Sequence, residues 1–109
     1  MSGPHTDLVN EIRLYLSSIG AMSVPVDTPG LLYSKDGTPV LLGKKGTLDI
    51  AATVKGRAVW IDAKIGKDRL KPKQVKFCEA QERAGGIGFA AWSVEDVANR
   101  LRMEGLLDG

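Results

Sequence analysis

Hydrophobic positions near the N-terminus recur every three or four residues, which is the spacing of one face of an α-helix. A proline precedes this stripe and Gly20 follows it, and both residue types are common at helix boundaries. We therefore expect a helix that begins at Pro4 and ends before Gly20. Its apolar face consists of Leu8, Ile12, Tyr15, Leu16 and Ile19.

Two further helices are expected in the second half of the chain. One covers residues 71–84 and stops at Gly85-Gly86, a strong C-terminal signal. The other follows Ser93, which caps it, with Asp96 three residues later in a variant of the capping box. The inward faces are Leu70, Gln74, Phe77, Cys78 and Gln81 for the first and Val94, Val97, Ala98 and Leu101 for the second.

Apolar segments without helical spacing predict strands at residues 21–28 and 87–92. Pro25 lacks the N–H that a central strand donates, so the first of these strands is expected at the edge of a sheet. Residues 29–46 contain several glycines and prolines, and we expect them to form a loop with a turn at residues 33–37.

Two more apolar and β-branched segments, residues 47–54 and 57–65, flank Lys55-Gly56, which suits the tight turn of a β-hairpin. If Lys55 and Gly56 form the turn, Val54 pairs with Arg57, and the residue numbers of every further pair also add up to 111. Asp49 then directly faces Asp62. The whole chain then has the element order αβββαβα, an α/β fold.

The two facing carboxylates predict a bound cation. Facing Cβ atoms lie about 5 Å apart, and two carboxylates at that distance repel by roughly 3 kcal/mol at an effective dielectric of 20. A divalent ion with oxygen ligands, Mg²⁺ or Mn²⁺, offsets this repulsion. Lys64 lies two residues beyond Asp62 and thus on the same face of the sheet, where its ammonium also balances the acids.

Composition places the chain among ordinary globular proteins. Its 109 residues suit one domain, residues 1–109, and no segment approaches the length of a membrane span. The single cysteine, Cys78, excludes an internal disulfide and is expected to be a small buried hydrophobe, which fits a cytoplasmic protein. The single histidine, His5, is expected to be exposed, which argues against a zinc site.

Charge is concentrated around the predicted acidic pair. Residues 35–76 contain eleven Lys or Arg against four acids, although the net charge of the chain is only +2. One interpretation is that these bases solubilise loops and a helix face. Clustering around an acidic centre favours the other, attraction of a phosphodiester polyanion. The candidate DNA contacts are Lys44, Lys45, Lys67, Arg69, Lys71 and Lys73.

Asp49, followed at a distance by Asp62-Ala63-Lys64, resembles the PD-(D/E)xK nuclease signature. Glu11 on the preceding helix and Gln74 on the following helix complete an order similar to the VRR-NUC branch of that superfamily. That branch includes small stand-alone phage proteins and the catalytic domain of the Fanconi-associated nuclease. The resemblance covers about residues 4–92 and implies a restriction-endonuclease-like αβββαβ core, with a mixed sheet flanked by helices and an added C-terminal helix.

The resemblance also implies which residues act. Two positions depart from the branch, since Leu48 stands in place of the usual proline and Asp62 in place of glutamate. The implied catalytic residues are Glu11, Asp49, Asp62, Lys64 and Gln74. The implied ligands of Mg²⁺ or Mn²⁺ are Asp49, Asp62, the Ala63 backbone carbonyl and Glu11, although Glu11 is equally well explained as a solvated residue at the helix boundary.

The substrate implied by the resemblance is branched DNA, since phage members of the branch look like Holliday-junction resolvases. A homodimer would match the two symmetric cuts of a four-way junction. Trp60, on the same face as Asp62, either stacks on a base or packs against the first helix. A flap or nicking nuclease, a non-catalytic DNA-binding module and an ordinary charged hairpin are the alternatives.

Overall fold

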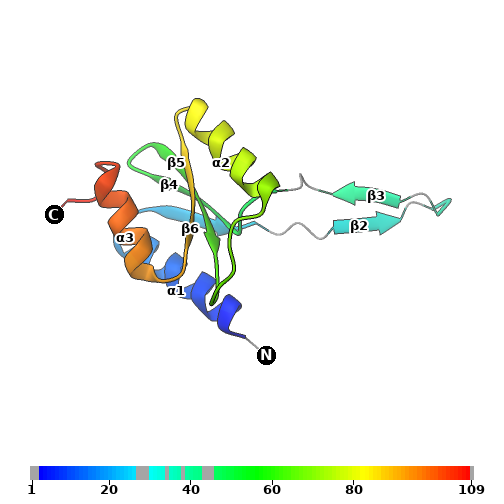
Figure 1. The fold of residues 1–109 in the computed structure, drawn as a ribbon, viewed down its shortest axis with the longest axis horizontal. Coiled ribbons are helices and arrows are strands. Elements are labelled where there is room, and N and C mark those ends of the chain that lie inside the picture. The colour runs from blue at the N-terminus through cyan, green and yellow to red at the C-terminus, as the bar shows by residue number, and fades with distance from the viewer. Residues whose placement is uncertain (1–2, 27–29, 34, 38, 43–45, 109) are drawn as a thin grey trace.

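The structure is a computed structural model that describes residues 3–26, 30–33, 35–37, 39–42 and 46–108. Within these residues, three helices and six strands follow one another, and Figure 1 shows their arrangement. They are α1 (Pro4–Ser18), β1 (Met22–Pro25), β2 (Gly30–Tyr33), β3 (Pro39–Leu42), β4 (Ile50–Val54), β5 (Arg57–Ala63), α2 (Pro72–Arg83), β6 (Ile87–Ala91) and α3 (Val94–Met103).

A four-stranded mixed sheet in the order β1-β4-β5-β6 forms the centre of the molecule. Strand β4 is antiparallel to both β1 and β5, whereas β5 and β6 run parallel. The α/β class, the mixed sheet and the C-terminal helix are therefore confirmed. Strand β1 lies at the edge of the sheet, as Pro25 predicted.

The β4–β5 hairpin has the predicted register. Ile50 pairs with Ile61 and Val54 with Arg57, so the loop contains two residues. Both loop residues, Lys55 and Gly56, have positive φ angles of 48° and 83°, the combination that a tight hairpin turn between right-twisted strands requires.

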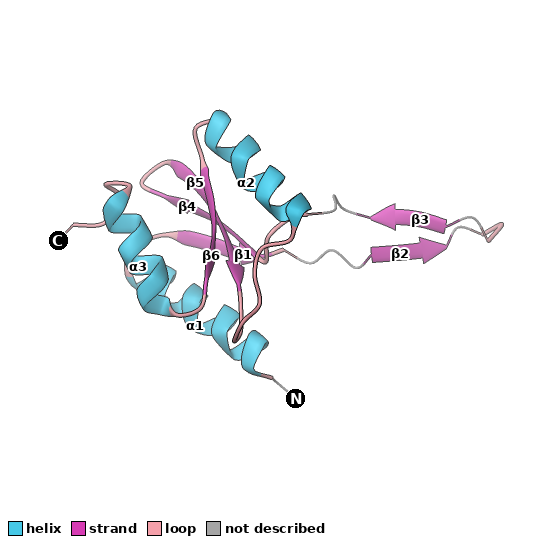
Figure 2. Cartoon of the chain, viewed as in Figure 1, coloured by secondary structure: helices cyan, strands magenta, loops and turns pink. Residues whose placement is uncertain are grey.

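Helices cover both faces of this sheet (Figure 2). The inward side chains of β5, such as Val59 and Ile61, share one buried core with Ile12 and Leu16 of α1 and Leu101 of α3. The opposite face lies beneath α2. The helix boundaries agree with those expected, and Ser93 Oγ accepts the predicted capping hydrogen bond from the Asp96 N–H at 3.1 Å. Among the described helices, none has the length and apolar character needed to cross a membrane.

The prediction that residues 29–46 form only a loop is wrong. Strands β2 and β3 pair antiparallel in a separate two-stranded sheet that projects from the body of the molecule (Figure 1). Short apolar segments flank the turn at Lys35 and Asp36, and proline is tolerated at Pro39 because it is the first residue of its strand. The glycines and prolines mark the ends of these strands and do not exclude them.

Candidate active site

The two acids lie at the open end of the β4–β5 hairpin, opposite its turn. Asp49 immediately precedes β4, and Asp62 lies near the end of β5. The Asp49 N–H donates a hydrogen bond to Asp62 Oδ1 at 3.1 Å, and the Ala63 N–H donates one to Asp49 Oδ2 at 3.0 Å. Each carboxylate is thus held by the backbone of the opposite strand. These reciprocal bonds bring the two carboxyl groups together, as the register predicts.

Asp62 is buried, with 3% of its surface exposed, whereas the Asp49 side chain remains 31% exposed. Burial raises the pKa of Asp62 above its ordinary value, and the neighbouring Asp49 carboxylate raises it further. The hydrogen bond from Lys64 opposes this shift without cancelling it. The centre therefore concentrates negative charge that a cation would stabilise.

Lys64 supplies that positive charge from an unusual position for a lysine, because only 5% of its surface is exposed. Its Nζ lies 2.8 Å from Asp62 Oδ2 and 3.8 Å from Asp68 Oδ2. The backbone N–H of Lys64 donates to the Ala91 carbonyl at 2.9 Å, which continues the β5–β6 pairing by one residue. Lys64 is thus fixed at both its backbone and its ammonium.

Gln74 connects this lysine to the start of α2. Its Oε1 accepts hydrogen bonds from Lys64 Nζ at 3.2 Å and from the Lys71 N–H at 2.9 Å. The oxygen of this half-buried amide is thus satisfied by a lysine and by the backbone at the helix N-terminus. Gln74 therefore orients Lys64.

His5 contacts the site and was missed by the sequence analysis. Its Nε2 lies 3.0 Å from Asp49 Oδ2, although the His5 side chain is 53% exposed as expected. Helical periodicity indicates the direction of this side chain but not its partner, because residues 5, 8 and 12 lie on one stripe and Leu8 and Ile12 are buried. His5 extends that stripe by one turn, to the mouth of the site.

Glu11, by contrast, is exposed on α1. It lies six residues after His5, which corresponds to about 9 Å along the helix axis and about 120° around it. Within the described residues, no group of three or more His, Cys, Asp or Glu side chains is arranged to hold a metal ion. The structure brings Asp49, Asp62, Lys64 and Gln74 together, and a metal role for Glu11 stays a prediction.

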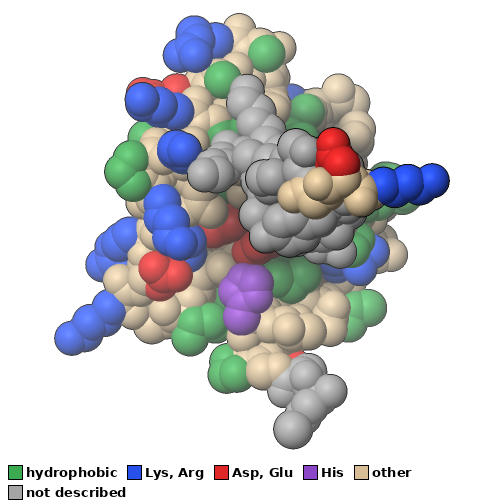
Figure 3. All heavy atoms as spheres, turned by 90° about the vertical axis from the view of Figure 1, so that its right-hand side faces the viewer, with side chains coloured by type: hydrophobic (Ala, Val, Ile, Leu, Met, Phe, Trp, Pro, Cys, Tyr) green, Lys and Arg blue, Asp and Glu red, His purple; other side chains and the backbone are tan. Residues whose placement is uncertain are grey.

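Basic side chains border the acidic centre. Lys67, Arg69, Lys71 and Lys73 are exposed on the segment that leads from β5 into α2. In Figure 3, acidic side chains lie beside the single histidine, with Lys and Arg side chains gathered along one flank. The other two predicted DNA contacts, Lys44 and Lys45, lie outside the described residues.

A hollow of about 540 Å³ opens beside Gln74 at the start of α2. Gly46, Thr47, Lys71 and Lys73 contribute to its walls. A polyanion in this hollow would contact Lys71 and Lys73 and would lie beside Gln74, which accepts a hydrogen bond from Lys64.

Trp60 projects from the same face as Asp62, but the expectation that it packs against the first helix is wrong. Its ring meets Phe77 of α2 edge-on, with centroids 4.9 Å apart and an interplanar angle of 78°. Helix α2 covers this face of the sheet, whereas α1 covers the other, and Trp60 is therefore a packing residue.

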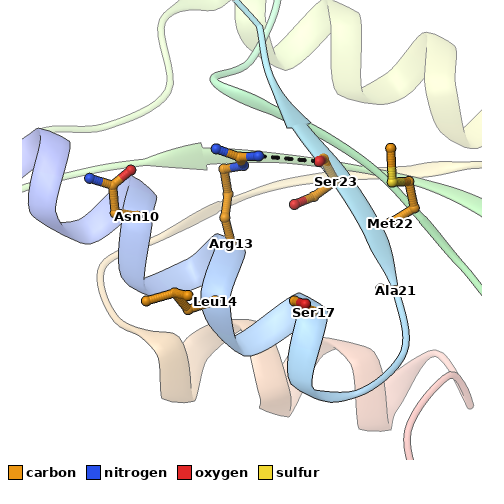
Figure 4. Close-up of a pocket in the computed structure, with 7 residues that line it drawn as sticks. All are labelled: Asn10, Arg13, Leu14, Ser17, Ala21, Met22 and Ser23. Atoms are coloured by element: carbon orange, nitrogen blue, oxygen red, sulfur yellow. Dashed lines mark hydrogen bonds between the residues drawn. The ribbon is translucent and has the colours of Figure 1, made fainter.

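A separate groove of about 480 Å³ lies between α1 and β1 (Figure 4). Asn10, Leu14 and Met22 are among its lining residues. Arg13 donates a hydrogen bond to the Ser23 carbonyl at 3.4 Å and so ties the edge strand to the helix (Figure 4). The groove shares no lining residue with the acidic centre.

No protein-family model matches the chain, and no curated protein matches it either.

Proposed function

We propose that the chain is a metal-dependent DNA endonuclease that hydrolyses phosphodiester bonds, with a VRR-NUC-like core of the PD-(D/E)xK type. The observation that carries the proposal is the convergence of two carboxylates and a buried lysine at one end of the β4–β5 hairpin. Burying Asp62 beside a second carboxylate is costly for a fold, and functional sites are where such costs are tolerated.

The donor set of this centre suits Mg²⁺ or Mn²⁺. Asp49 and Asp62 offer hard carboxylate oxygens, and the Ala63 backbone carbonyl would add a third oxygen. Burial and the neighbouring Asp49 carboxylate raise the pKa of Asp62, and a bound cation would offset both effects by stabilising the ionised carboxylate. When bound, the ion would lower the pKa of a coordinated water and offset charge on the pentacovalent phosphate.

Lys64 and Gln74 would orient the reacting groups and stabilise the charge that develops on the phosphate. The Lys64 ammonium, held between Asp62 and Gln74, would position the attacking water or stabilise the developing negative charge on phosphate. Gln74 maintains the direction of that ammonium. The resemblance further implies products with 5′-phosphate ends.

Branched DNA, such as a four-way junction, is the proposed substrate, in the cytoplasm of a bacterium or phage-infected cell. The exposed bases Lys67, Arg69, Lys71 and Lys73 would follow the phosphate backbone towards the acidic centre.

A homodimer would supply the two cuts that a four-way junction requires. Edge strand β1 is the proposed contact, because its outer edge faces away from β4 and Met22 is 69% exposed there. Leu14, on the adjacent helix, is 72% exposed and would extend the same apolar surface.

The test is cleavage of end-labelled four-way junction, flap, duplex and single-stranded DNA with Mg²⁺, Mn²⁺ or EDTA. Wild type is compared with Asp62→Ala and Lys64→Ala, and Glu79→Ala serves as a matched control because that acid is exposed on α2 and is not among the partners of Lys64. Metal-dependent cutting that both site variants lose and the control retains would support the proposal. Absence of cutting, with tight metal-independent DNA binding by every variant, would favour a non-catalytic binding module.

A further inference from the structure

Trp92 is a large exposed side chain beside the acidic centre, and the proposed hydrolysis leaves it without a role. Strand β6 ends at Ala91, and the parallel register pairs Asp62 with Ala90 and Ala63 with Ala91. Lys64 and Trp92 are the residues that follow this last pair, and the Lys64 N–H donates to the Ala91 carbonyl at 2.9 Å. Trp92 is therefore attached to the residue that bonds the backbone of the lysine that contacts Asp62.

Contacts of the loop between β5 and α2 link Trp92 to the acidic centre. Arg69 of this loop lies over the Trp92 ring, and the adjacent Asp68 has its Oδ2 3.8 Å from Lys64 Nζ. Trp92 is 38% exposed there. Its indole is therefore available to a ligand that reaches the acidic centre.

The backbone of Trp92 is held rigidly. Its N–H donates a hydrogen bond to Asp96 Oδ2 at 2.8 Å, which is part of the cap that begins α3. A hydrophobic side chain displayed at 38% exposure from a fixed backbone is suited to contact a planar ligand with little loss of conformational entropy.

Arg69 adds positive charge to this aromatic surface. Its guanidinium carbon lies 5.5 Å from the centroid of the Trp92 ring, the geometry of a cation–π contact. Nη1 of the same guanidinium donates to the carbonyls of Lys67 at 3.3 Å and Asp68 at 3.1 Å, so the loop holds it in place. The pair thus offers a π-surface, a planar cation and an adjoining basic loop.

We propose that Trp92 and Arg69 form a stacking subsite for an unpaired nucleobase next to the phosphodiester at the acidic centre. Aromatic rings and guanidinium planes both stack on bases, and the positive charge complements the adjoining phosphates. A base inside a regular duplex is already stacked on its neighbours, so the subsite favours bases whose stacking is interrupted, as at the branch point of a junction or in a flap. This inference rests on the proposed hydrolysis of DNA for the identity of its ligand.

The test measures binding in EDTA, so that cutting cannot interfere. Fluorescence anisotropy compares a labelled oligothymidylate with an abasic oligomer of the same length and charge. Wild type is expected to bind the oligothymidylate more tightly than the abasic strand. Trp92→Ala is expected to weaken oligothymidylate binding by about 5- to 100-fold and to leave abasic binding unchanged.

Control variants separate stacking from folding and charge. Trp92→Phe keeps an aromatic ring and should retain part of the preference for bases, whereas Met103→Ala removes another exposed apolar side chain and should change nothing. Arg69→Lys keeps the charge and should reduce only the oligothymidylate affinity. Equal affinity of wild type for the two strands, or equal loss on both with Trp92→Ala, would overturn the subsite.

The two proposals fail in different ways. If the protein binds oligothymidylate more tightly than the abasic strand through Trp92, yet cuts no DNA with Mg²⁺ or Mn²⁺, the stacking subsite is supported and the proposed hydrolysis is contradicted. If the protein cuts DNA but binds the two strands with equal affinity, the proposed hydrolysis is supported and the stacking subsite is contradicted.

Discussion

Replacing Lys64 by methionine should strongly destabilise the fold, because it leaves Asp62 buried without its counter-ion. The Nζ–Oδ2 distance of 2.8 Å corresponds to an attraction of about 6 kcal/mol at an effective dielectric of 20. Much of this attraction offsets the cost of removing both charges from water. Removal of one partner from a buried pair costs about 3–5 kcal/mol, which is the loss in unfolding free energy expected at neutral pH.

The destabilisation should shrink as the pH falls. The pKa of Asp62 is already raised, and loss of the ammonium that opposes this shift would raise it further. Between the ordinary carboxyl pKa and that raised value, the folded variant binds a proton that the unfolded chain does not. Its stability therefore increases as the pH falls through this window.

Urea denaturation followed by circular dichroism, at neutral and at acid pH, measures this effect. Lys67→Met, on an exposed lysine of the same region, is the matched control and should change stability little. The double variant Asp62→Asn with Lys64→Met should recover much of the loss, because no unpaired charge remains buried. A loss below about 1 kcal/mol for Lys64→Met, or a double variant as unstable as the sum of the single changes, would refute the reasoning.

Three further outcomes follow from the structure. Gly46→Ala should cost more stability in urea than Gly56→Ala. Both glycines have positive φ, but a Cβ on Gly46 would lie 2.6 Å from the Lys73 carbonyl oxygen, whereas one on Gly56 meets nothing within 4 Å; equal losses would contradict this. Burial raises the pKa of the Cys78 thiol, so an alkylating reagent should label it slowly until urea unfolds the protein, and rapid labelling of the folded protein would be the opposite result. Mn²⁺ should raise the Tm of wild type but not of Asp62→Asn, by an increment that shrinks as the pH falls through the raised Asp62 pKa; an increment independent of pH would contradict proton competition at this carboxylate.

Local chemistry made part of the site predictable. Lys55-Gly56 specifies a two-residue turn, and strand pairing then determines that Asp49 faces Asp62. The burial of Lys64 was not predictable in the same way, because it depends on how α2 packs on the sheet. The same tertiary packing decides that Trp60 meets Phe77.

The His5 contact and the β2–β3 pair were not predicted, for different reasons. His5 lies on the buried stripe of its helix, but its contact with Asp49 joins residues 44 positions apart, and periodicity does not reveal such a partner. The short apolar segments of β2 and β3 lie among glycines and prolines, which are typical of loops, and the pairing that makes them strands is not visible in the sequence pattern.

The central claim is that the Asp49–Asp62 pair serves metal-dependent phosphodiester hydrolysis. Its most direct test is the single-turnover rate at which purified protein cuts a four-way junction in saturating Mn²⁺, for wild type beside Asp49→Asn. The substitution preserves the size of a half-exposed side chain and removes its charge. The account predicts cutting by wild type, with 5′-phosphate ends, and its loss in Asp49→Asn when both proteins unfold at similar temperatures. Equal rates for the two proteins would contradict it.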